Sequence, residues 1–501
     1  MNGTASPSVT AQQLSAAAPG DLAAQVRETH TGVVVLLGDR AYKAKKPVVT
    51  DFLDFSTVAH RERACQHEVA LNRRLAPDSY LGVAHLTDPR GGEPEPVIVM
   101  RRYSDTTRLA SLVTSGAPVR EHLLAIARVL ARFHSVAERR AAIDAQGSVD
   151  AVWARWRQNL RELKTFSDEV VIPDSLREAT RMAGQFVAGR QALFAQRITE
   201  RHILDGHADL LADDIFCLPE GPALLDCLEF DDLLRYVDGI DDAAFLAMDL
   251  EFLGGKGLAD YFLEQYMQCS GDPAPRALVD FYIAYRAVVR AKVDCIRVAQ
   301  GHPEAAGDAR RHLDIALQHL RAGTVRLIIV GGGPGTGKTT LSTALADQLG
   351  ARVISTDEVR RQLQDDGVVS GAAGELNTGL YSPTNVAVVY DEVLRQAQAW
   401  LSCGHSVILD GTWRDAGHLD RAHELARQAS VPIVEFTCSV PIGEASARIR
   451  RRPRSNSDAT PHVAATLAGT GCGRGDAHHI DTGRPLADSV REAQEICCCA
   501  I

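Results

Sequence analysis

Residues 332–340, GGPGTGKTT, carry the most specific chemical pattern in this 501-residue sequence. They match G-x-x-x-x-G-K-[ST], with an apolar strand before the loop and a helix-forming segment after it. In such a loop backbone N–H groups surround phosphate oxygens, the lysine reaches the β- and γ-phosphates and the following hydroxyl binds Mg²⁺. A glycine-rich turn without a ligand is the alternative, but it does not account for the whole pattern. We therefore predict that ATP and Mg²⁺ bind at Gly332, Gly333, Pro334, Gly335, Thr336, Gly337, Lys338, Thr339 and Thr340.

Two acidic residues follow apolar strands of the same region. Asp410 ends "SVIL", which suits a carboxylate that arranges Mg²⁺ through water, although an aspartate there can also cap the next turn. Asp357 follows "VIST" at the mouth of the expected sheet, where open α/β sheets bind ligands. We predict that Asp357 accepts the proton of a substrate hydroxyl. The alternative role for Asp357, capping the next helix, is compatible with this one.

Further on, "ASARIRRRPRSNSDA" concentrates cationic side chains in a short stretch. Phosphoryl transfer needs cations over the transferring group, and a mobile segment can supply them. We assign Arg451 to nucleotide contact, and a solvated basic helix end is an equally good interpretation. The arginines of this stretch are Arg448, Arg450, Arg451, Arg452 and Arg454.

A second stretch, "DGHADLLADDIF" at 205–216, places His207 two residues before Asp209 in an acidic loop. If this is a phosphotransferase loop, a phosphate-gripping lysine must stand on an early strand. "RAYKAKK" supplies Lys43 and Lys45, which share one strand face because their spacing is two. We select Lys43, and the alternative is a solvated lysine on an edge strand.

Such a loop also requires a glutamate before it and a metal-binding acid after it, and both are present along the chain. Glu68, in a segment with helical spacing, can orient the lysine, or it can simply face solvent. Asp226 follows apolar "ALL" 17 positions after Asp209 and is predicted to bind metal. Each signal is weak alone, but the order Lys, Glu, His-x-Asp, Asp is complete.

The elements expected around these residues fall into two types. Near the start, "GVVVLLGDRAYKAKKP" predicts a hairpin turning at Gly38–Asp39, and residues 119–300 are mostly helical by their apolar spacing. A helix closes this part and Gly323 follows it in a capping position. Beyond residue 322, the apolar strands "VRLIIV", "ARVIST", "HSVILD" and "VPIVEFTC" alternate with helices, which predicts a parallel, doubly wound sheet.

These stretches carry two family resemblances. Residues 324–501 resemble P-loop small-molecule kinases, a group that includes gluconate kinase, polynucleotide kinase and zeta-toxin-like enzymes, through "GGGPGTGKTTL", "STDEVR" and "SVILDGTW". Residues 1–322 resemble the aminoglycoside phosphotransferase-like family through "AYKAKKPV", "ERACQHEVALNRRLAP" and "DCLEFDDLLRYVD". The whole chain looks like the bacterial proteins that fuse the two. Residues 1–20 are rich in Ala, Ser, Thr and Gln, which predicts a disordered leader. With the change of pattern near residue 322, we predict an α+β kinase-like domain at 21–322 and an α/β P-loop domain at 323–501.

The kinase-like resemblance implies roles within the second stretch. The family pattern is H-G-D-L-H-x-x-N, so His207 would support the loop, Asp209 would be the catalytic base, and Asp226 would bind metal with the residue at 214. This sequence has Ala208, Leu211 and Asp214 where the family has Gly, His and Asn. Asp214 keeps an oxygen ligand for Mg²⁺ but adds negative charge, and alanine lacks the freedom of glycine. The resemblance thus leaves open an active site or a nucleotide-binding regulatory module.

Composition narrows the partners. A formal net charge of −10 argues against a protein built to grip nucleic acid or anionic lipid, and no apolar run approaches the roughly 20 residues that span a bilayer. Eleven cysteines, mostly scattered singly, indicate reduced buried thiols and a cytoplasmic protein. The tail "CCCAI" has a formal C-a-a-X pattern without polybasic residues, so we interpret it as a frayed, oxidisable end.

Three residues of the helical region are open to interpretation. Arg286 and Arg290 share a helix face that can grip an anion or pair with the acids of "DGIDD", whereas His134 is interpreted as structural.

The leading hypothesis is an ATP-dependent phosphotransferase acting on a small hydroxylated molecule, with two nucleotide-binding domains. The alternative is an N-terminal nucleotide sensor or partner-binding module that regulates a P-loop ATPase or kinase. A mechanical ATPase is disfavoured because no ring-forming element is evident.

Overall fold

The computed structural model describes residues 24–28, 32–49, 54–87, 91–166, 170–372, 377–451 and 477–500. The predicted disordered leader at 1–20 and the basic residues Arg452 and Arg454 lie outside these ranges. The chain forms two compact units, one of Met1–Ser148 with Arg197–Ala274 and one of Val149–Gln196 with Pro275–Ile501.

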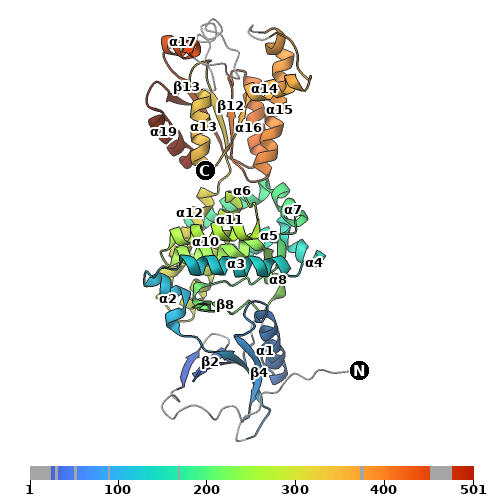
Figure 1. Cartoon of the computed structure of the whole chain (residues 1–501), viewed down its shortest axis with the longest axis vertical. Coiled ribbons are helices and arrows are strands. Elements are labelled where there is room, and N and C mark those ends of the chain that lie inside the picture. Colours follow the sequence, from blue (N-terminus) through green and yellow to red (C-terminus); the bar gives the residue numbers. More distant parts are fainter. Residues whose placement is uncertain are drawn as a thin grey trace. The chain divides into compact units, whose positions relative to one another are not determined.

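The first unit begins with a five-stranded antiparallel sheet (Figure 1). The predicted hairpin is confirmed, because β2 and β3 pair across a turn in which Gly38 has a φ of 57°. Helix α1 (Val58–Asn72) begins where the Thr57 side chain accepts a hydrogen bond from the His60 N–H, and it packs Cys65 and Val69 against the sheet. The strand order is β1 (Gln25–Glu28), β2 (Gly32–Leu37), β3 (Arg40–Lys45), β5 (Glu95–Arg101) and β4 (Tyr80–Leu86).

The rest of this unit is mainly helical, as its apolar spacing predicts. Helix α9 is buried on almost every side, whereas α3 and α10 are amphipathic and pack on one another (Figure 1). The helices are α2 (Leu109–Thr114), α3 (Arg120–Val136), α4 (Ala141–Asp144), α8 (Asp232–Arg235), α9 (Gly239–Phe252) and α10 (Lys256–Ser270). This part also contains two short antiparallel strand pairs. They are β6 (Ile203–Asp205) with β9 (Tyr236–Asp238) and β7 (Ile215–Leu218) with β8 (Gly221–Leu224).

The second unit joins a helical part to a parallel sheet. Its helical part has an aromatic core in which Phe186 stacks on Phe281 with ring centroids 4.3 Å apart, beside Trp156. Helix α12 ends at Gly323 as predicted, but with a φ of −79° rather than a left-handed cap. The helices are α5 (Val149–Lys164), α6 (Pro173–Gly189), α11 (Arg276–Ala299), α12 (Ala305–Ala322) and α7 (Gln191–Thr199), which begins in this unit.

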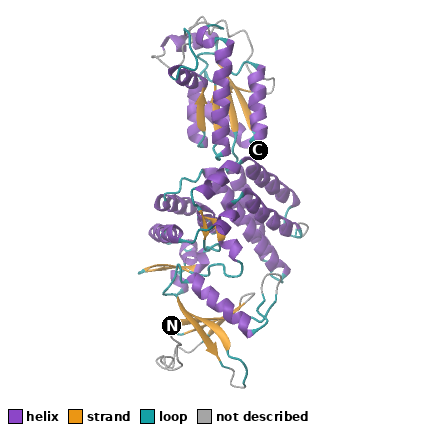
Figure 2. Cartoon of the chain, turned by 90° about the vertical axis from the view of Figure 1, so that its right-hand side faces the viewer, coloured by secondary structure: helices purple, strands orange, loops and turns teal. Residues whose placement is uncertain are grey.

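The parallel sheet confirms the predicted doubly wound α/β fold. Its strands run in the order β11 (Arg352–Ser355), β12 (Val407–Asp410), β10 (Leu327–Gly331), β13 (Ile433–Ser439) and β14 (His478–Asp481), all parallel. Helices lie on both sides of the strands, which Figure 2 shows in orange between purple ribbons. These helices are α13 (Lys338–Leu349), α14 (Thr356–Asp365), α15 (Pro383–Ser402), α16 (Ala416–Gln428), α17 (Ile442–Arg451) and α19 (Leu486–Cys499).

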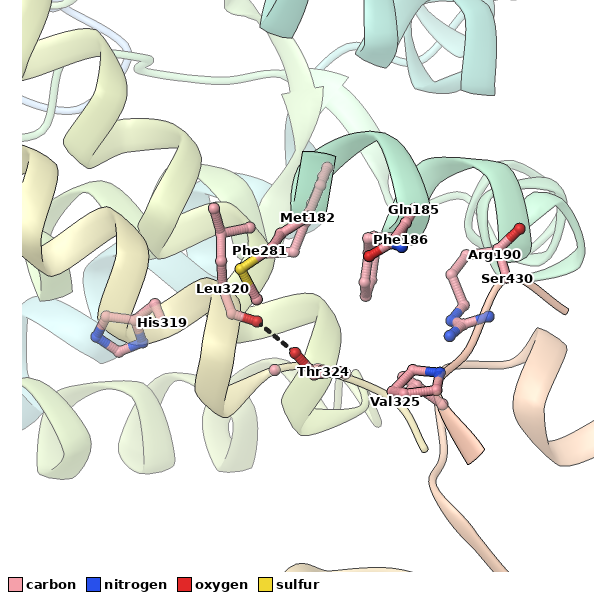
Figure 3. A pocket seen from close by; sticks show the side chains of 13 residues that line it. Met182, Gln185, Phe186, Arg190, Phe281, His319, Leu320, Thr324, Val325 and Ser430 are labelled. Carbon is pink, nitrogen blue, oxygen red and sulfur yellow. Dashed lines mark hydrogen bonds between the residues drawn. The ribbon is translucent and has the colours of Figure 1, made fainter. Parts of the chain in front are cut away.

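A close backbone approach connects the helical part to the sheet part. A Cβ atom on Gly189 at the end of α6 would lie 2.0 Å from the Ala429 carbonyl oxygen, so only glycine fits there. The buried Arg190 guanidinium donates to that same oxygen at 3.0 Å. Figure 3 shows Arg190 beside a cavity of about 30 Å³, which is the size for a water molecule rather than an organic ligand.

The cysteine-rich tail is a correction to the sequence interpretation. Residues up to Cys499 are helical, and Cys497 is fully buried against Cys438 and Ile480 in the core of the sheet domain. Its carbonyl also accepts a hydrogen bond of 2.9 Å from the Arg326 Nε. The prediction of a frayed end was wrong because Val490, Ala493 and Cys497 repeat at helical spacing and form a packed apolar face, whereas Cys498 and Cys499 are exposed free thiols.

The predicted boundary near residue 322 remains a prediction. Contacts group α5, α6, α11 and α12 with the sheet domain, although the sequence assigns them to the kinase-like part. In the ranges given above, no helix is both long and apolar enough to span a membrane.

Candidate active sites

The glycine-rich loop links the end of β10 to the start of α13. Gly332, Gly335 and Gly337 have φ values of 142°, 78° and 84°, which side chains other than glycine rarely adopt. A Cβ atom on Gly335 would also lie 2.6 Å from the Ala445 carbonyl oxygen, and one on Gly332 would lie 2.7 Å from that of Cys438. The three glycines are therefore required by the backbone path, which is the path that leaves N–H groups free to face an anion.

Three polar side chains meet at the base of this loop. Thr339 donates a hydrogen bond of 2.7 Å to the buried carboxylate of Asp410, and Lys338 donates one of 2.9 Å to the Gly333 carbonyl oxygen. Burial raises the pKa of Asp410 more than the neighbouring Lys338 and the Thr339 hydrogen bond lower it. A hydroxyl and a carboxylate so placed fit Mg²⁺, which binds a few protein oxygens and completes its shell with water and phosphate oxygens.

Asp357 lies at the same edge of the sheet. Ser355, at the end of β11, is level with Asp410 on the adjacent strand, and Asp357 follows in the first turn of α14. Its negative charge contributes to the raised pKa of Asp410, so the two carboxylates are neighbours. Ser355, not Asp357, is the N-cap of α14, and Asp357 instead accepts a hydrogen bond of 2.6 Å from Arg360.

The described arginines of the basic segment lie in different surroundings. Arg448 on α17 lies over the glycine-rich loop, with its Nη1 3.3 Å from where a Cβ of Gly337 would stand. It donates to the Thr482 carbonyl oxygen at 2.8 Å, and the Thr482 hydroxyl donates to the Thr336 carbonyl oxygen at 2.6 Å. Arg451, the residue we selected, is exposed at the end of α17. Thr482 was not predicted, because no local pattern connects it to Thr336, 146 residues earlier.

In the first unit, β3 and α1 bring the predicted lysines to one glutamate. The fully buried Glu68 carboxylate lies 2.8 Å from Lys43 Nζ and 2.5 Å from Lys45 Nζ. Lys43 also contacts Asp226 at 2.6 Å, whereas Lys45 contacts Glu229 at 2.6 Å. Lys43 is thus the lysine beside the predicted metal ligand, and Lys45 is held by the missed residue Glu229.

The acidic residues of this site differ in protonation. Burial opposes ionisation of Asp226, yet Lys43 lowers its pKa below the ordinary value. Burial raises the pKa of Asp214 well above its ordinary value, and the negative charges of Asp226 and Asp209 raise it further. The pKa of Asp214 thus reflects the negative charges of both Asp209 and Asp226 in its surroundings. The raised pKa favours the neutral form of Asp214, which carries the same charge as the asparagine of the family pattern.

Asp242 on α9 holds the backbone of the loop. Its carboxylate oxygens accept hydrogen bonds from the N–H groups of His207 and Ala208 at 2.7 Å each. Ala208 has a φ of 67°, a left-handed conformation that glycine adopts at lower cost than alanine. The His207 ring lies 3.0 Å from the Leu225 carbonyl oxygen and accepts a long hydrogen bond of 3.3 Å from the Asp209 N–H. The predicted supporting role of His207 fits these contacts.

The remaining predicted residues lie outside the two sites. The His134 ring contacts Asp242 at 3.0 Å and the Tyr266 hydroxyl at 2.8 Å, both buried, which agrees with a structural role. Arg286 is buried on α11 with its guanidinium 5.5 Å from the Tyr285 ring centre, and Arg290 is half-buried.

The described residues form no metal centre from protein groups alone. In the part of the chain that the structure covers, no three His, Cys, Asp or Glu side chains are arranged to hold a metal ion. Phosphate oxygens would have to complete either Mg²⁺ site, as is usual for Mg²⁺ in phosphoryl-transfer sites.

Comparison with known proteins gives one sequence family and several structures. The family model described as "AAA domain" matches residues 327–469. A choline/ethanolamine kinase family protein from Mesorhizobium loti is 17% identical with a TM-score of 0.36, and covers 62% of this chain and 95% of its own. A gluconokinase from Sinorhizobium meliloti is 18% identical with a TM-score of 0.25, and covers 35% of this chain and 93% of its own.

Full-length relatives are mycobacterial. The uncharacterized protein Rv2004c of Mycobacterium tuberculosis is 60% identical over 471 residues, which span 94% of this chain and 95% of Rv2004c. The uncharacterized protein Mb2027c of Mycobacterium bovis matches to the same extent. The kinase-like and P-loop parts therefore occur together in these relatives. The chain belongs to the family of Rv2004c.

Proposed function

We propose that the protein is an ATP-dependent phosphotransferase whose P-loop domain phosphorylates a hydroxyl group of a small molecule. The observation that carries this proposal is the 2.7 Å hydrogen bond between Thr339 and Asp410 at the base of a glycine-rich loop that ends in Lys338. The "AAA domain" match over 327–469 supports nucleotide use, and the acidic mouth of the sheet supports transfer to an acceptor.

The roles of the chain's own groups follow from their positions. Backbone N–H groups of the loop and the N-terminus of α13 bind phosphate, because four N–H groups at a helix start have no partner within the helix. The Lys338 ammonium leaves the Gly333 carbonyl for a phosphate oxygen, a stronger, charge-assisted partner. Mg²⁺, when bound through Thr339 and Asp410, supplies charge neutralisation at the transferring group.

Asp357 is the candidate base in this domain. Its side chain is about one-third exposed at the carboxyl edge of the sheet, close enough to Asp410 to affect its ionisation. It can therefore accept a proton from an acceptor hydroxyl held at that edge. Arg448, which bridges the loop and Thr482, places a cation over the phosphate-binding segment.

We further propose a second nucleotide site in the first unit. Lys43 would move from Asp226 to phosphate oxygens when Asp226 and Asp214 take up Mg²⁺, and Glu68 would keep Lys43 oriented throughout. Asp209 is the candidate base there. The alternative, a sensor without turnover, is supported by the strained φ of Ala208 and by the raised pKa of Asp214, which must lose its proton before it can bind Mg²⁺ as a carboxylate.

The identity of the phosphate acceptor is tested first. A panel of sugars, sugar acids, amino alcohols and aminoglycosides should be screened for acceptor-dependent ADP release by the full chain. Asp357→Asn is expected to lower acceptor-dependent turnover about 10²- to 10⁴-fold with ATP binding unchanged, because it removes only the proton acceptor. Asp209→Asn is the matched variant in the first unit. If neither variant alters acceptor-dependent turnover, the assignment of bases is wrong.

A further inference from the structure

The first unit contains a cavity of about 450 Å³ that neither proposed active site uses. It lies among α3, the end of α10 and the start of β6. His202 lines it directly before β6, whereas Asp209 follows β6, so the two lie beyond opposite ends of that strand. The volume is in the range of small-molecule sites, which are commonly 300–1,000 Å³.

The lining of this cavity is rich in positive charge. Arg128 and Arg132, one turn apart on α3, are exposed side chains, and within the described residues neither has an ion-pair or hydrogen-bond partner for its guanidinium. The described hydrogen bonds of the Arg139 guanidinium all go to carbonyl oxygens, those of His134, Ala137 and Arg201. No described carboxylate therefore neutralises these three arginines at contact distance.

Among the described residues of the lining, the one acid is Asp272, which is paired with an arginine that also pairs with Asp238. Asp272 binds Arg197 through both of its oxygens, at 2.5 and 2.6 Å. A bidentate pair of this kind leaves the carboxylate little capacity for the cavity arginines. The charged side chains of the cavity wall are thus mainly positive, and Tyr266 and Ser270 are also among its lining residues.

The cavity wall is connected to the catalytic loop. His134, which lines the cavity, contacts the Asp242 carboxylate at 3.0 Å and the Tyr266 hydroxyl at 2.8 Å. Asp242 in turn accepts the N–H groups of His207 and Ala208. A change at the cavity wall that moves His134 therefore acts on a residue in direct contact with the carboxylate that holds the loop.

We propose that this cavity binds a small phosphate ester through Arg128, Arg132 and Arg139, and that its occupation is transmitted to the loop at 205–216 through His134 and Asp242. Planar guanidinium groups match phosphate oxygens in pairs, and the volume exceeds that of a bare ion and leaves room for a hydroxylated carbon skeleton. The transmission rests on the proposed function of the loop, whereas the binding does not.

Binding is tested by calorimetry on the full chain. Glucose 6-phosphate, 3-phosphoglycerate and inorganic phosphate are the probes, and Lys338→Ala is the background that removes phosphate binding at the glycine-rich loop. We expect saturable binding of at least one ester, weakened about tenfold or more in the Arg128→Gln, Arg132→Gln double variant. Arg63→Gln, an exposed arginine on α1 outside the cavity, is the matched control and should leave the affinity unchanged. No saturable binding up to about 10 mM, or binding insensitive to the double variant, would overturn the proposal.

Transmission is tested by hydrogen–deuterium exchange of a peptide spanning 203–212. The bound ester should slow exchange of this peptide in the Lys338→Ala background and leave it unchanged in the same background carrying the double variant. Ester binding with unchanged exchange would overturn transmission while supporting the site. Neither measurement depends on turnover. A wrong site therefore shows as absent or variant-insensitive ester binding, whereas an inactive loop leaves ester binding intact.

Discussion

Asp242 accepts the N–H of Ala208 at 2.7 Å and so holds a left-handed alanine, with a φ of 67°, directly before the candidate base of the first unit. Replacing Asp242 therefore tests how much this acceptor contributes to the stability of the folded protein. Asp242→Ala leaves two buried N–H groups and His134 without their partner, so we expect the free energy of unfolding to fall by about 3 kcal/mol. Urea unfolding followed by circular dichroism measures it. Asp308→Ala, in the first turn of α12 in the other unit, is a control, and an equal loss there would refute the role of Asp242.

Ala208→Gly is expected to stabilise the protein. A left-handed alanine costs roughly 1 kcal/mol, which exceeds the smaller entropic penalty of introducing glycine at a position already suited to it. We expect a rise of a few tenths to about 1 kcal/mol in the free energy of unfolding. Ala212→Gly, four residues on and without a positive φ, should instead destabilise by roughly 0.5–1 kcal/mol. Equal effects of both changes would contradict this account.

Asp214 predicts a pH dependence of stability. Its pKa is raised in the folded state by burial and then by Asp226 and Asp209, so the folded protein binds a proton that the unfolded chain releases near pH 3.9. The stabilisation is complete below about pH 3.9 and is lost as the pH rises through the folded-state pKa. Asp214→Asn, with no such proton, should therefore be more stable than the wild type at neutral pH without nucleotide. Thermal unfolding between pH 5 and 8 measures the difference, and a difference that does not grow with pH would contradict the assignment.

Thr482→Val is expected to weaken ATP binding in the P-loop domain. Its hydroxyl donates to the Thr336 carbonyl oxygen at 2.6 Å and thus fixes the loop from the side of β14. Loss of one such hydrogen bond corresponds to about 1 kcal/mol, or roughly fivefold in affinity. Thr482→Ser keeps the hydroxyl and should bind like the wild type in a nucleotide titration. A Val variant with unchanged affinity would show that the contact does not position the loop.

The sequence predicted the parts of both sites that local patterns encode. Strand, glycine-rich loop and helix follow one another within one stretch, so Lys338 and Thr339 could be placed without a structure. The spacing of two between Lys43 and Lys45 also put them on one face, as their shared Glu68 shows.

Long-range contacts could not be predicted in the same way. Asp242 and Thr482 act through backbone groups that any sequence has, so nothing in their own neighbourhood marks them. The burial of Cys497 was not predicted, because the run of three cysteines was interpreted from its chemistry alone. Its helical spacing from Val490 and Ala493 places it in the core.

The most direct test of the account is Mg²⁺-dependent ATP binding and turnover by the wild type, Lys338→Ala, Asp209→Ala and the double variant. Two functional sites predict that Lys338→Ala retains one bound ATP and a residual turnover that Asp209→Ala removes. If Lys338→Ala alone abolishes turnover and Asp209→Ala changes nothing, the loop at 205–216 is a sensor or a relic. Full ATP binding and turnover in Lys338→Ala would contradict the central claim that the P-loop domain is a phosphotransferase.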